Sequence, residues 1–146
     1  MGKALIVFAT RSGGTKKLAE LIAEGLRIAG HEAELKRVTD IKKPEDLNGY
    51  DAYVFGSATY HGKMINLMER MLFLAEKADL EGKPGGAFGS YGWSGEAPDR
   101  IYSTMENIFK MDMTGGSLRV KPAYVMNPDG IKAAQEYGKN IAKKIS

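Results

Sequence analysis

Short apolar runs alternate with amphipathic segments along this 146-residue chain. The run at residues 4–9 is continuous and rich in β-forming side chains, as in strands that are buried on both faces of a parallel sheet. Residues 15–29 place their apolar side chains on one helical face, and Gly30 follows as the expected left-handed cap. Residues 31–38 alternate between polar and apolar side chains. The pattern predicts a strand, a helix and a second strand.

The rest of the chain continues this alternation. The expected elements, in chain order, are a connector with Pro44 at the first position of a short helical turn (39–50), a strand (53–56), a helix (65–77), a strand (86–89), a helix from about Pro98, a fifth strand bent at Pro122 (118–120 and 123–126), and a last helix capped by Asn127 with Pro128 at its first position.

Five strands alternating with four main helices predict an α/β fold of three layers, in which helices cover both faces of a parallel sheet. At this length we expect the five-stranded order 2-1-3-4-5 rather than a six-stranded dinucleotide-binding sheet. The order of such a sheet reverses between its first and third strands, so the loops after residues 9 and 56 should flank a ligand crevice. No linker or internal repeat interrupts the pattern, which predicts a single domain over residues 1–146.

Composition narrows the possible functions. The net charge is +3 and the lysines are spread over several segments, which favours a solvated surface over a nucleic-acid-binding face. The chain has no cysteine, which excludes disulfides, thiolate catalysis and iron–sulfur ligation by its own residues. Because it has only two histidines, we expect no His-rich metal site. The N-terminal apolar run is too short for a signal peptide or a membrane span, which predicts a cytoplasmic protein without membrane association.

The loop after the first strand suits a phosphate group. Residues 10–15 read Thr-Arg-Ser-Gly-Gly-Thr and directly precede a helix, whose free amides and dipole favour an anion. The hydroxyls of Thr10, Ser12 and Thr15 can each donate a further hydrogen bond. The loop matches neither the triphosphate-binding pattern Gly-x4-Gly-Lys-Ser/Thr nor the dinucleotide pattern Gly-x-Gly-x-x-Gly. A bound monophosphate fits best; the alternative is a hydroxyl-rich turn in which Thr15 only caps the helix.

Two further loops are expected beside this one. Residues 57–63 read Ser-Ala-Thr-Tyr-His-Gly-Lys, which on its own indicates a surface connection. Residues 86–96 alternate glycines with Tyr91 and Trp93, which are poorly placed to fill a core but well placed to lie against a flat ligand. Because all three loops should converge on one crevice, the sequence predicts a planar, heteroaromatic cofactor that carries a phosphate.

Together, the three loops resemble those of the flavodoxin-like FMN-binding domains, and the similarity covers essentially the whole chain. Residues 88–96, Phe-Gly-Ser-Tyr-Gly-Trp-Ser-Gly-Glu, are most similar to the flavodoxin module of flavodiiron proteins. The diiron domain of those proteins needs more histidines than this chain has, so the resemblance implies a stand-alone flavin module. The cofactor-binding residues that it implies are Thr10, Arg11, Ser12, Gly13, Gly14, Thr15, Ser57, Ala58, Thr59, Tyr60, His61, Gly62, Gly89, Ser90, Tyr91, Gly92, Trp93 and Glu96.

The resemblance also implies roles for these loops in an electron carrier that works with redox partner proteins. The FMN phosphate would lie on residues 10–15, and the isoalloxazine ring between residues 57–62 and Tyr91 or Trp93. Stacking on an aromatic face disfavours the electron-rich reduced flavin, and thereby shifts its potential. Tyr60 stands where many flavodoxins place a stacking aromatic, so three aromatic side chains compete for two ring faces.

The charge of the chain departs from this family. Familiar free flavodoxins are strongly acidic, so the net charge of +3 weakens the expectation of a partner with a basic docking face. Arg11, His61 and Lys63 are close in sequence to the flavin loops, and we expect them to stabilise the anionic, fully reduced flavin and make its potential less negative. Exposed aromatics on the flavin-side loops would favour self-association, which predicts a homodimer through those loops.

Two other functions were weighed. An FMN-dependent NAD(P)H or quinone oxidoreductase, or a protoporphyrinogen-oxidase-like enzyme, would have the same fold but usually adds insertions that enclose a substrate; the short connections here favour a carrier. A phosphoacceptor receiver domain shares the sheet order, but it needs clustered acidic residues after the first strand and an aspartate at the end of the third. The chain has Phe8, Ala9 and Thr10 at the first place and Ser57 at the second, which excludes this function.

Overall fold

The computed structural model describes residues 2–9, 13–60, 63–64, 66–90, 96–121 and 124–145. Within these ranges, a six-stranded sheet has the order β2-β1-β3-β6-β7, with β8 also paired to β6, and every pair in it is parallel. Its strands are β1 (Lys3–Ala9), β2 (Glu32–Arg37), β3 (Ala52–Ser57), β6 (Pro84–Ser90), β7 (Asp112–Met113) and β8 (Leu118–Val120). Since β7 and β8 together occupy the fifth position, the predicted order 2-1-3-4-5 is confirmed.

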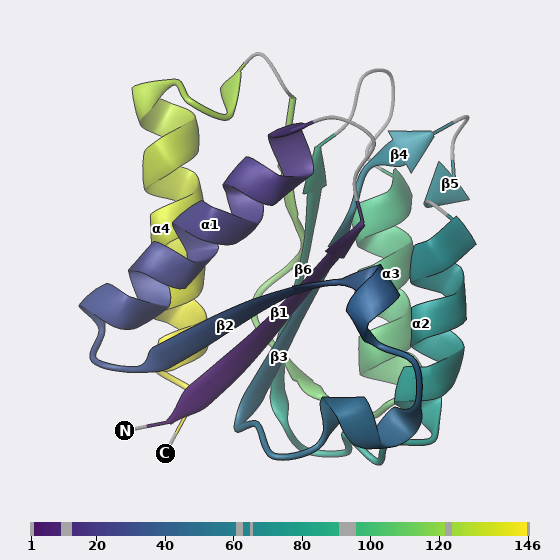
Figure 1. Ribbon diagram of the computed structural model, residues 1–146. Helices are drawn as coiled ribbons and strands as arrows, with labels where there is room; N and C mark the ends of the chain where they lie inside the picture. Colours follow the sequence, from purple (N-terminus) through teal and green to yellow (C-terminus); the bar gives the residue numbers. More distant parts are fainter. Residues whose placement is uncertain are drawn as a thin grey trace.

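Helices cover both faces of this sheet (Figure 1). They are α1 (Gly13–Ile28), α2 (Asn66–Glu76), α3 (Glu96–Asn107) and α4 (Pro128–Ala142). The helices α1 and α4 pack on one face, and α2 and α3 on the other (Figure 1). Along β1, Ile6 belongs to the core under α1 and α4, whereas Leu5 and Val7 belong to the core under α2 and α3. This two-sided burial explains why the first strand is a continuous apolar run rather than an alternating one.

Local sequence signals correctly place several element ends. Gly30 has a φ of 95° directly after α1, as expected of a left-handed cap. Pro44 opens the 3-10 helix η2 (Pro44–Leu47), which follows the 3-10 helix η1 (Val38–Asp40). The Asn127 side chain accepts a hydrogen bond of 3.1 Å from the Asp129 amide at the start of α4. Each signal acts within a few residues, which is why the sequence alone reveals it.

The fifth strand differs from its prediction. Residues 118–120 form β8, but the other half of the strand is β7, which precedes β8; of residues 123–126, those that the structure describes form a turn, in which the Asn127 amide donates to the Tyr124 carbonyl. The prediction of a strand is therefore wrong over residues 124–126, whereas Ala123 and the predicted bend at Pro122 lie outside the described residues. Val125 is buried, but its neighbours Tyr124 and Met126 are exposed, so this apolar run does not have the two-sided burial of a central strand.

A small hairpin in the second loop was not predicted. The strands β4 (Thr59–Tyr60) and β5 (Lys63–Met64) pair antiparallel, with Thr59 opposite Met64. The hairpin contacts α3 and lies beyond the end of β3 (Figure 1). Within the described ranges, no helix combines the length and the apolar character needed to cross a membrane.

Candidate functional site

The ends of β1, β3 and β6 lie side by side at one edge of the sheet, here called the carboxyl edge (Figure 1, top). Ala9 is paired with Ser57, and Gly56 with Phe88. Ala58, one residue past the end of β3, also donates a 3.3 Å hydrogen bond from its amide to the carbonyl of Ala9 in β1. The segments that carry the predicted cofactor-binding residues therefore begin at neighbouring strand ends, as the predicted topology requires.

The N-terminus of α1 lies at the carboxyl edge and begins with Gly13 and Gly14. Its first turn holds no acidic residue, so no carboxylate from that turn neutralises the positive end of the helix dipole. Thr15 is fully buried in this turn. Because α1 begins at Gly13, Thr15 lies inside the first turn and not at the N-cap position that the capping alternative requires. Thr10, Arg11 and Ser12 lie outside the described residues.

The loop after β3 is held to the sheet at its start. Ser57 is fully buried, and its hydroxyl donates a 2.9 Å hydrogen bond to the Ala58 carbonyl. Thr59 and Tyr60 then form β4, so this segment leaves the sheet as a hairpin strand with a defined register. His61 and Gly62 lie outside the described residues.

The end of β6 passes very close to β3 and α3. A Cβ atom added at Gly89 would lie 2.2 Å from the Ser57 carbonyl oxygen and 2.7 Å from Cγ of Pro98. Glycine is therefore needed here for close packing, whether or not it also touches a ligand. Ser90 ends β6 and Glu96 begins α3, while Tyr91, Gly92 and Trp93 lie outside the described residues.

A polar cluster that the sequence reasoning missed ties α3 to β8. Asp99, in the first turns of α3, accepts a 2.5 Å hydrogen bond from the Ser117 hydroxyl and lies 3.4 Å from the Arg119 guanidinium. These contacts fix the helix into which the third predicted loop runs. They join residues 18 and 20 positions apart, and no local pattern in the sequence signals them.

A buried tyrosine supports β6 from below the carboxyl edge. The Ala87 amide donates a 2.9 Å hydrogen bond to the Tyr137 hydroxyl, which in turn donates to the Gly116 carbonyl at 2.9 Å. Burial raises the pKa of Tyr137 well above its usual range, which keeps the hydroxyl protonated and able to donate. The bond to Ala87 spans 50 residues, and no local pattern in the sequence indicates it.

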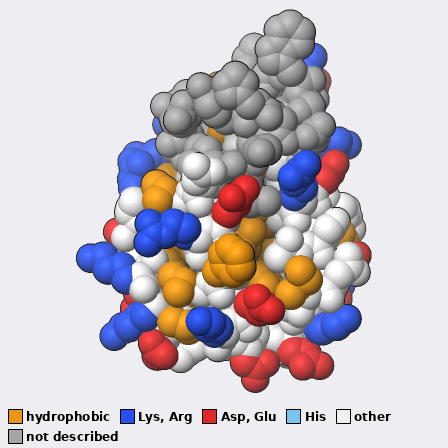
Figure 2. Space-filling model, turned by 90° about the vertical axis from the view of Figure 1, so that its right-hand side faces the viewer, with side chains coloured by type: hydrophobic (Ala, Val, Ile, Leu, Met, Phe, Trp, Pro, Cys, Tyr) orange, Lys and Arg blue, Asp and Glu red, His pale blue; other side chains and the backbone are white. Residues whose placement is uncertain are grey.

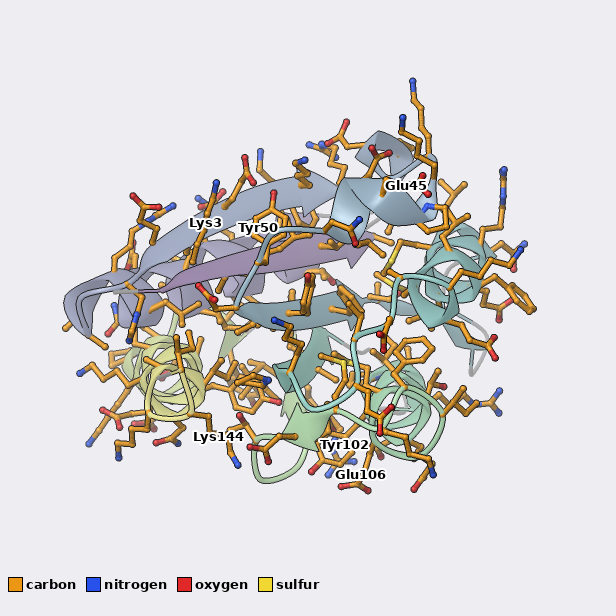
Figure 3. All side chains as sticks on the ribbon, turned by 90° about the horizontal axis from the view of Figure 1, so that it is seen from below. Lys3, Glu45, Tyr50, Tyr102, Glu106 and Lys144 are labelled. Atoms are coloured by element: carbon orange, nitrogen blue, oxygen red, sulfur yellow. The ribbon has the colours of Figure 1, made fainter. Side chains whose placement is uncertain are left out.

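Several charged side chains at the opposite edge of the sheet contact one another or an aromatic ring (Figure 3). Lys3 lies 5.3 Å from the centre of the Tyr50 ring, and the Tyr50 hydroxyl donates to Glu34. Lys144, near the end of the chain, pairs with Asp112 of β7 at 2.8 Å. No group of three or more potential metal ligands gathers among the residues that the structure describes. The carboxyl edge is thus the candidate site.

Comparisons with known proteins agree with this geometry. The sequence pattern of one protein family, described as flavodoxin, matches residues 6–124. A flavodoxin from Maridesulfovibrio salexigens is 33% identical over 99% of this chain and 100% of its own length. A solved structure titled as a flavodoxin from the domain Archaea superposes with a TM-score of 0.89 at 33% identity, covering 98% of both chains.

Two other kinds of relative also match. The flavo-diiron protein FprA2 of Clostridium acetobutylicum is 28% identical over 96% of this chain, which spans 36% of the length of FprA2. An NAD(P)H dehydrogenase (quinone) of Rhodopseudomonas palustris is 28% identical over 94% of this chain and 81% of its own length. The relatives therefore include free-standing proteins and a module of a longer protein.

Proposed function

The chain belongs to the flavodoxin family of FMN-binding electron carriers, and we propose that it holds FMN at the carboxyl edge and exchanges electrons with redox partner proteins. The observation that carries the proposal is the strand register, in which Ala9 pairs with Ser57 and Gly56 with Phe88. This register starts the three segments similar to FMN-binding loops at adjacent strand ends. Ligands of open α/β sheets bind at such an edge.

The residues at the edge fit the two chemically different parts of FMN. Residues 10–15 would hold the phosphate, because α1 begins within this segment with two glycines and without an acidic residue in its first turn. Residues 57–62 and 89–93 would lie on either side of the ring, with Tyr60, Tyr91 and Trp93 as the aromatic side chains that could stack on it.

FMN supplies a ring that can take up one or two electrons, and the chain supplies the rest. Amides of α1 would bind the phosphate, aromatic side chains would orient the ring and exclude water from it, and nearby cations would stabilise negative charge on the ring. The net charge of +3 suits partners whose docking faces are not basic. The predicted cytoplasmic location belongs to this proposal, whereas the homodimer through the flavin-side loops stays a prediction from the sequence alone.

An enzyme of the same fold is the second candidate function. The match to an NAD(P)H dehydrogenase (quinone) favours an FMN-dependent NAD(P)H or quinone oxidoreductase. The bounds of the elements leave three residues between β1 and α1 and five between β6 and α3, too few for an insertion that would enclose a substrate. This feature favours the carrier.

The FMN content of the purified chain and its reduction by NADH or NADPH alone distinguish the carrier from the enzyme. The purified chain should be yellow, or become so with added FMN, and should release FMN on denaturation. A carrier should then bleach slowly with NADH or NADPH alone and rapidly when a partner reductase is added. Rapid bleaching by the nucleotide alone would support the enzyme instead. A colourless chain that does not take up FMN would contradict both functions.

Thr15→Ala tests the phosphate end of the site. If the Thr15 hydroxyl donates to the FMN phosphate, its removal should weaken FMN binding by about 1–2 kcal/mol, a factor of roughly 5 to 30. Fluorescence titration of the apoprotein with FMN measures the change. Thr104→Ala is the matched control, because the Thr104 hydroxyl bonds the Arg100 carbonyl within α3. Equal FMN affinity of Thr15→Ala and the unsubstituted chain would contradict a hydrogen bond from the Thr15 hydroxyl to the phosphate.

A further inference from the structure

One side of the molecule, formed by α2 and α3, exposes large apolar side chains (Figure 2). Phe73 is 72% exposed, Ile108 56% and Leu67 42%. Phe73 stands between two grooves and lines both. One groove, of about 320 Å³, runs toward α3 over Leu72 and Phe109. The other, of about 440 Å³, runs toward η1 over Val38 and Met71.

Charges of opposite sign flank Phe73 on its two sides. At about 100° per residue, α2 places Glu69 and Glu76 within about 60° of Phe73 on one side and Arg70 within about 60° on the other. Lys77 directly follows α2 in a tight turn, in which its amide donates to the Leu74 carbonyl, and a rotation of about 100–120° from Glu76 places it on the Arg70 side. The grooves agree with this geometry, because Glu69 and Glu76 line the groove toward α3, whereas Arg70 lines the groove toward η1. We call this arrangement the α2 face: Phe73 with an acidic flank (Glu69, Glu76) and a basic flank (Arg70, Lys77).

The charges of the α2 face have no partners within the described ranges. All four flanking side chains are exposed, and none of them forms an ion pair with another described residue. A protein surface of a single sign would be attracted to one flank and repelled by the other. A surface that complements both flanks must carry a basic stripe and an acidic stripe on either side of an apolar ridge. The α2 face itself has this pattern.

We propose that two copies of this chain associate through their α2 faces, about a two-fold axis that runs parallel to α2. Such an axis lays the two α2 helices side by side in the same direction and brings each acidic flank against the basic flank of the other copy. The two Phe73 side chains meet at the centre. An antiparallel arrangement would instead place acidic flank on acidic flank, so the charges select the parallel one. The α2 faces lie along the side of the molecule, which leaves the carboxyl edges of both copies clear of the contact (Figure 1).

Sedimentation velocity of the full chain tests the association. From about 1 µM to about 1 mM, the sedimentation coefficient should rise from that of a monomer to that of a dimer. Phe73→Asp should raise the dimer dissociation constant at least about 30-fold, as expected for a central aromatic residue of an interface. The matched control is Ile28→Asp, because Ile28 is similarly exposed but lies at the end of α1 on the other side of the sheet. The Ile28→Asp variant should have the same dimer dissociation constant as the unsubstituted chain.

A charge exchange tests the parallel geometry. One variant carries Glu69→Lys and Glu76→Lys, and the other carries Arg70→Glu and Lys77→Glu. Each should be monomeric on its own, because like charges then face each other on both flanks, and an equimolar mixture should form a heterodimer. Far-UV circular dichroism verifies that both variants are folded. A monomeric unsubstituted chain at about 1 mM, a dimer that survives Phe73→Asp, or a monomeric mixture of folded variants would each overturn the proposal. The second outcome would locate the contact elsewhere, for example at the flavin-side loops.

Discussion

Tyr137 fills an interruption in the sheet. Gly85 of β6 pairs with Met113, and Phe88 pairs with Leu118, so three steps along β6 correspond to five along the fifth strand. Between these pairs, the Ala87 amide bonds the Tyr137 hydroxyl, which passes a hydrogen bond on to the Gly116 carbonyl. A side chain from α4 thus bridges two strands where they do not pair. The bridge thereby links β6 to the fifth strand just before β6 reaches the carboxyl edge.

Removal of this hydroxyl should destabilise the fold. Tyr137→Phe leaves the Ala87 amide buried without its partner, and we expect the free energy of unfolding at pH 7 to fall by about 1–3 kcal/mol. Urea denaturation followed by circular dichroism measures the loss. Tyr102→Phe is the control, because the Tyr102 hydroxyl accepts a weaker, exposed bond of 3.2 Å from the Gly116 amide and should change stability by less than about 0.5 kcal/mol. Equal effects of the two variants would contradict the bridging role.

The same residue predicts a pH dependence. Burial raises the pKa of Tyr137 in the folded protein, whereas in the unfolded chain the hydroxyl ionises near its ordinary pKa of about 10. The stabilisation by Tyr137 is therefore complete below about pH 10 and is lost as the pH rises further. We expect the difference in unfolding free energy between the unsubstituted chain and Tyr137→Phe to shrink above about pH 10. Other tyrosines cancel in this comparison, and a constant or growing difference would contradict the prediction.

At the scale of elements, α1 and α4 pack backbone to backbone. A Cβ atom at Gly138 would lie 2.2 Å from the Ile22 carbonyl oxygen, and one at Gly25 would lie 2.1 Å from the Gln135 carbonyl oxygen. Backbone atoms cannot move aside as a flexible side chain can. These two glycines therefore set how closely the helix pair fits over its face of the sheet, and so where the N-terminus of α1 stands at the carboxyl edge.

Gly138→Ala should force this helix pair apart. Helix propensity alone would favour alanine by about 1 kcal/mol, but the clash with the Ile22 carbonyl should outweigh it. We expect a net loss of about 1–3 kcal/mol in the free energy of unfolding, measured by urea denaturation. Gly115→Ala is the control, since a Cβ atom there meets nothing within 4 Å. An alanine at position 138 that stabilises the chain would show that α1 and α4 can separate without loss.

The elements that the sequence revealed are those with a local cause. The strand β1 is apolar because both its faces are buried, and the start of α4 is marked by Asn127 and Pro128. By contrast, β7 has two residues and exists through its pairing with Pro84 and Gly85, far away in the sequence. The hairpin of β4 and β5 pairs residues only three to five positions apart, but each of its strands has two residues. Strands of two residues are too short to show a periodic pattern.

The candidate site divides in the same way. Its position at the carboxyl edge follows from the strand order, which the alternation of apolar runs predicted. The packing role of Gly89 does not follow from the strand order. The close approach of Ser57 and Pro98 to Gly89 depends on how β3, β6 and α3 pack together. The predicted ring contacts of Tyr91 and Trp93 lie outside the described residues and stay predictions.

At the scale of the whole molecule, charge distinguishes this chain from acidic carriers. Its net charge is +3 and its isoelectric point is about 9.0. Beyond about 8 Å at physiological salt, a single charge is largely screened, so its position matters more than the total. Lys63 lies in β5 of the hairpin that follows β3, whereas Lys143 follows α4 at the opposite edge of the sheet (Figure 1). Both residues add one positive charge, but Lys63 alone of the pair directly follows a segment proposed to border FMN, residues 57–62.

The different positions of Lys63 and Lys143 predict different effects on the reduction potential of the bound flavin. A cation near the ring stabilises the negative charge of the fully reduced flavin, so Lys63→Gln should make the potential of the last reduction step more negative. Arg11→Gln should act in the same direction. Lys143→Gln removes the same unit of net charge far from the ring and should leave the potential unchanged. Potentiometric titration of the FMN-loaded chain at physiological salt measures all three. Equal shifts in the potential of Lys63→Gln and Lys143→Gln would show that the total charge, rather than its placement, sets the potential. A potential of the unsubstituted chain as low as in acidic flavodoxins would show that neither the total charge nor its placement raises it.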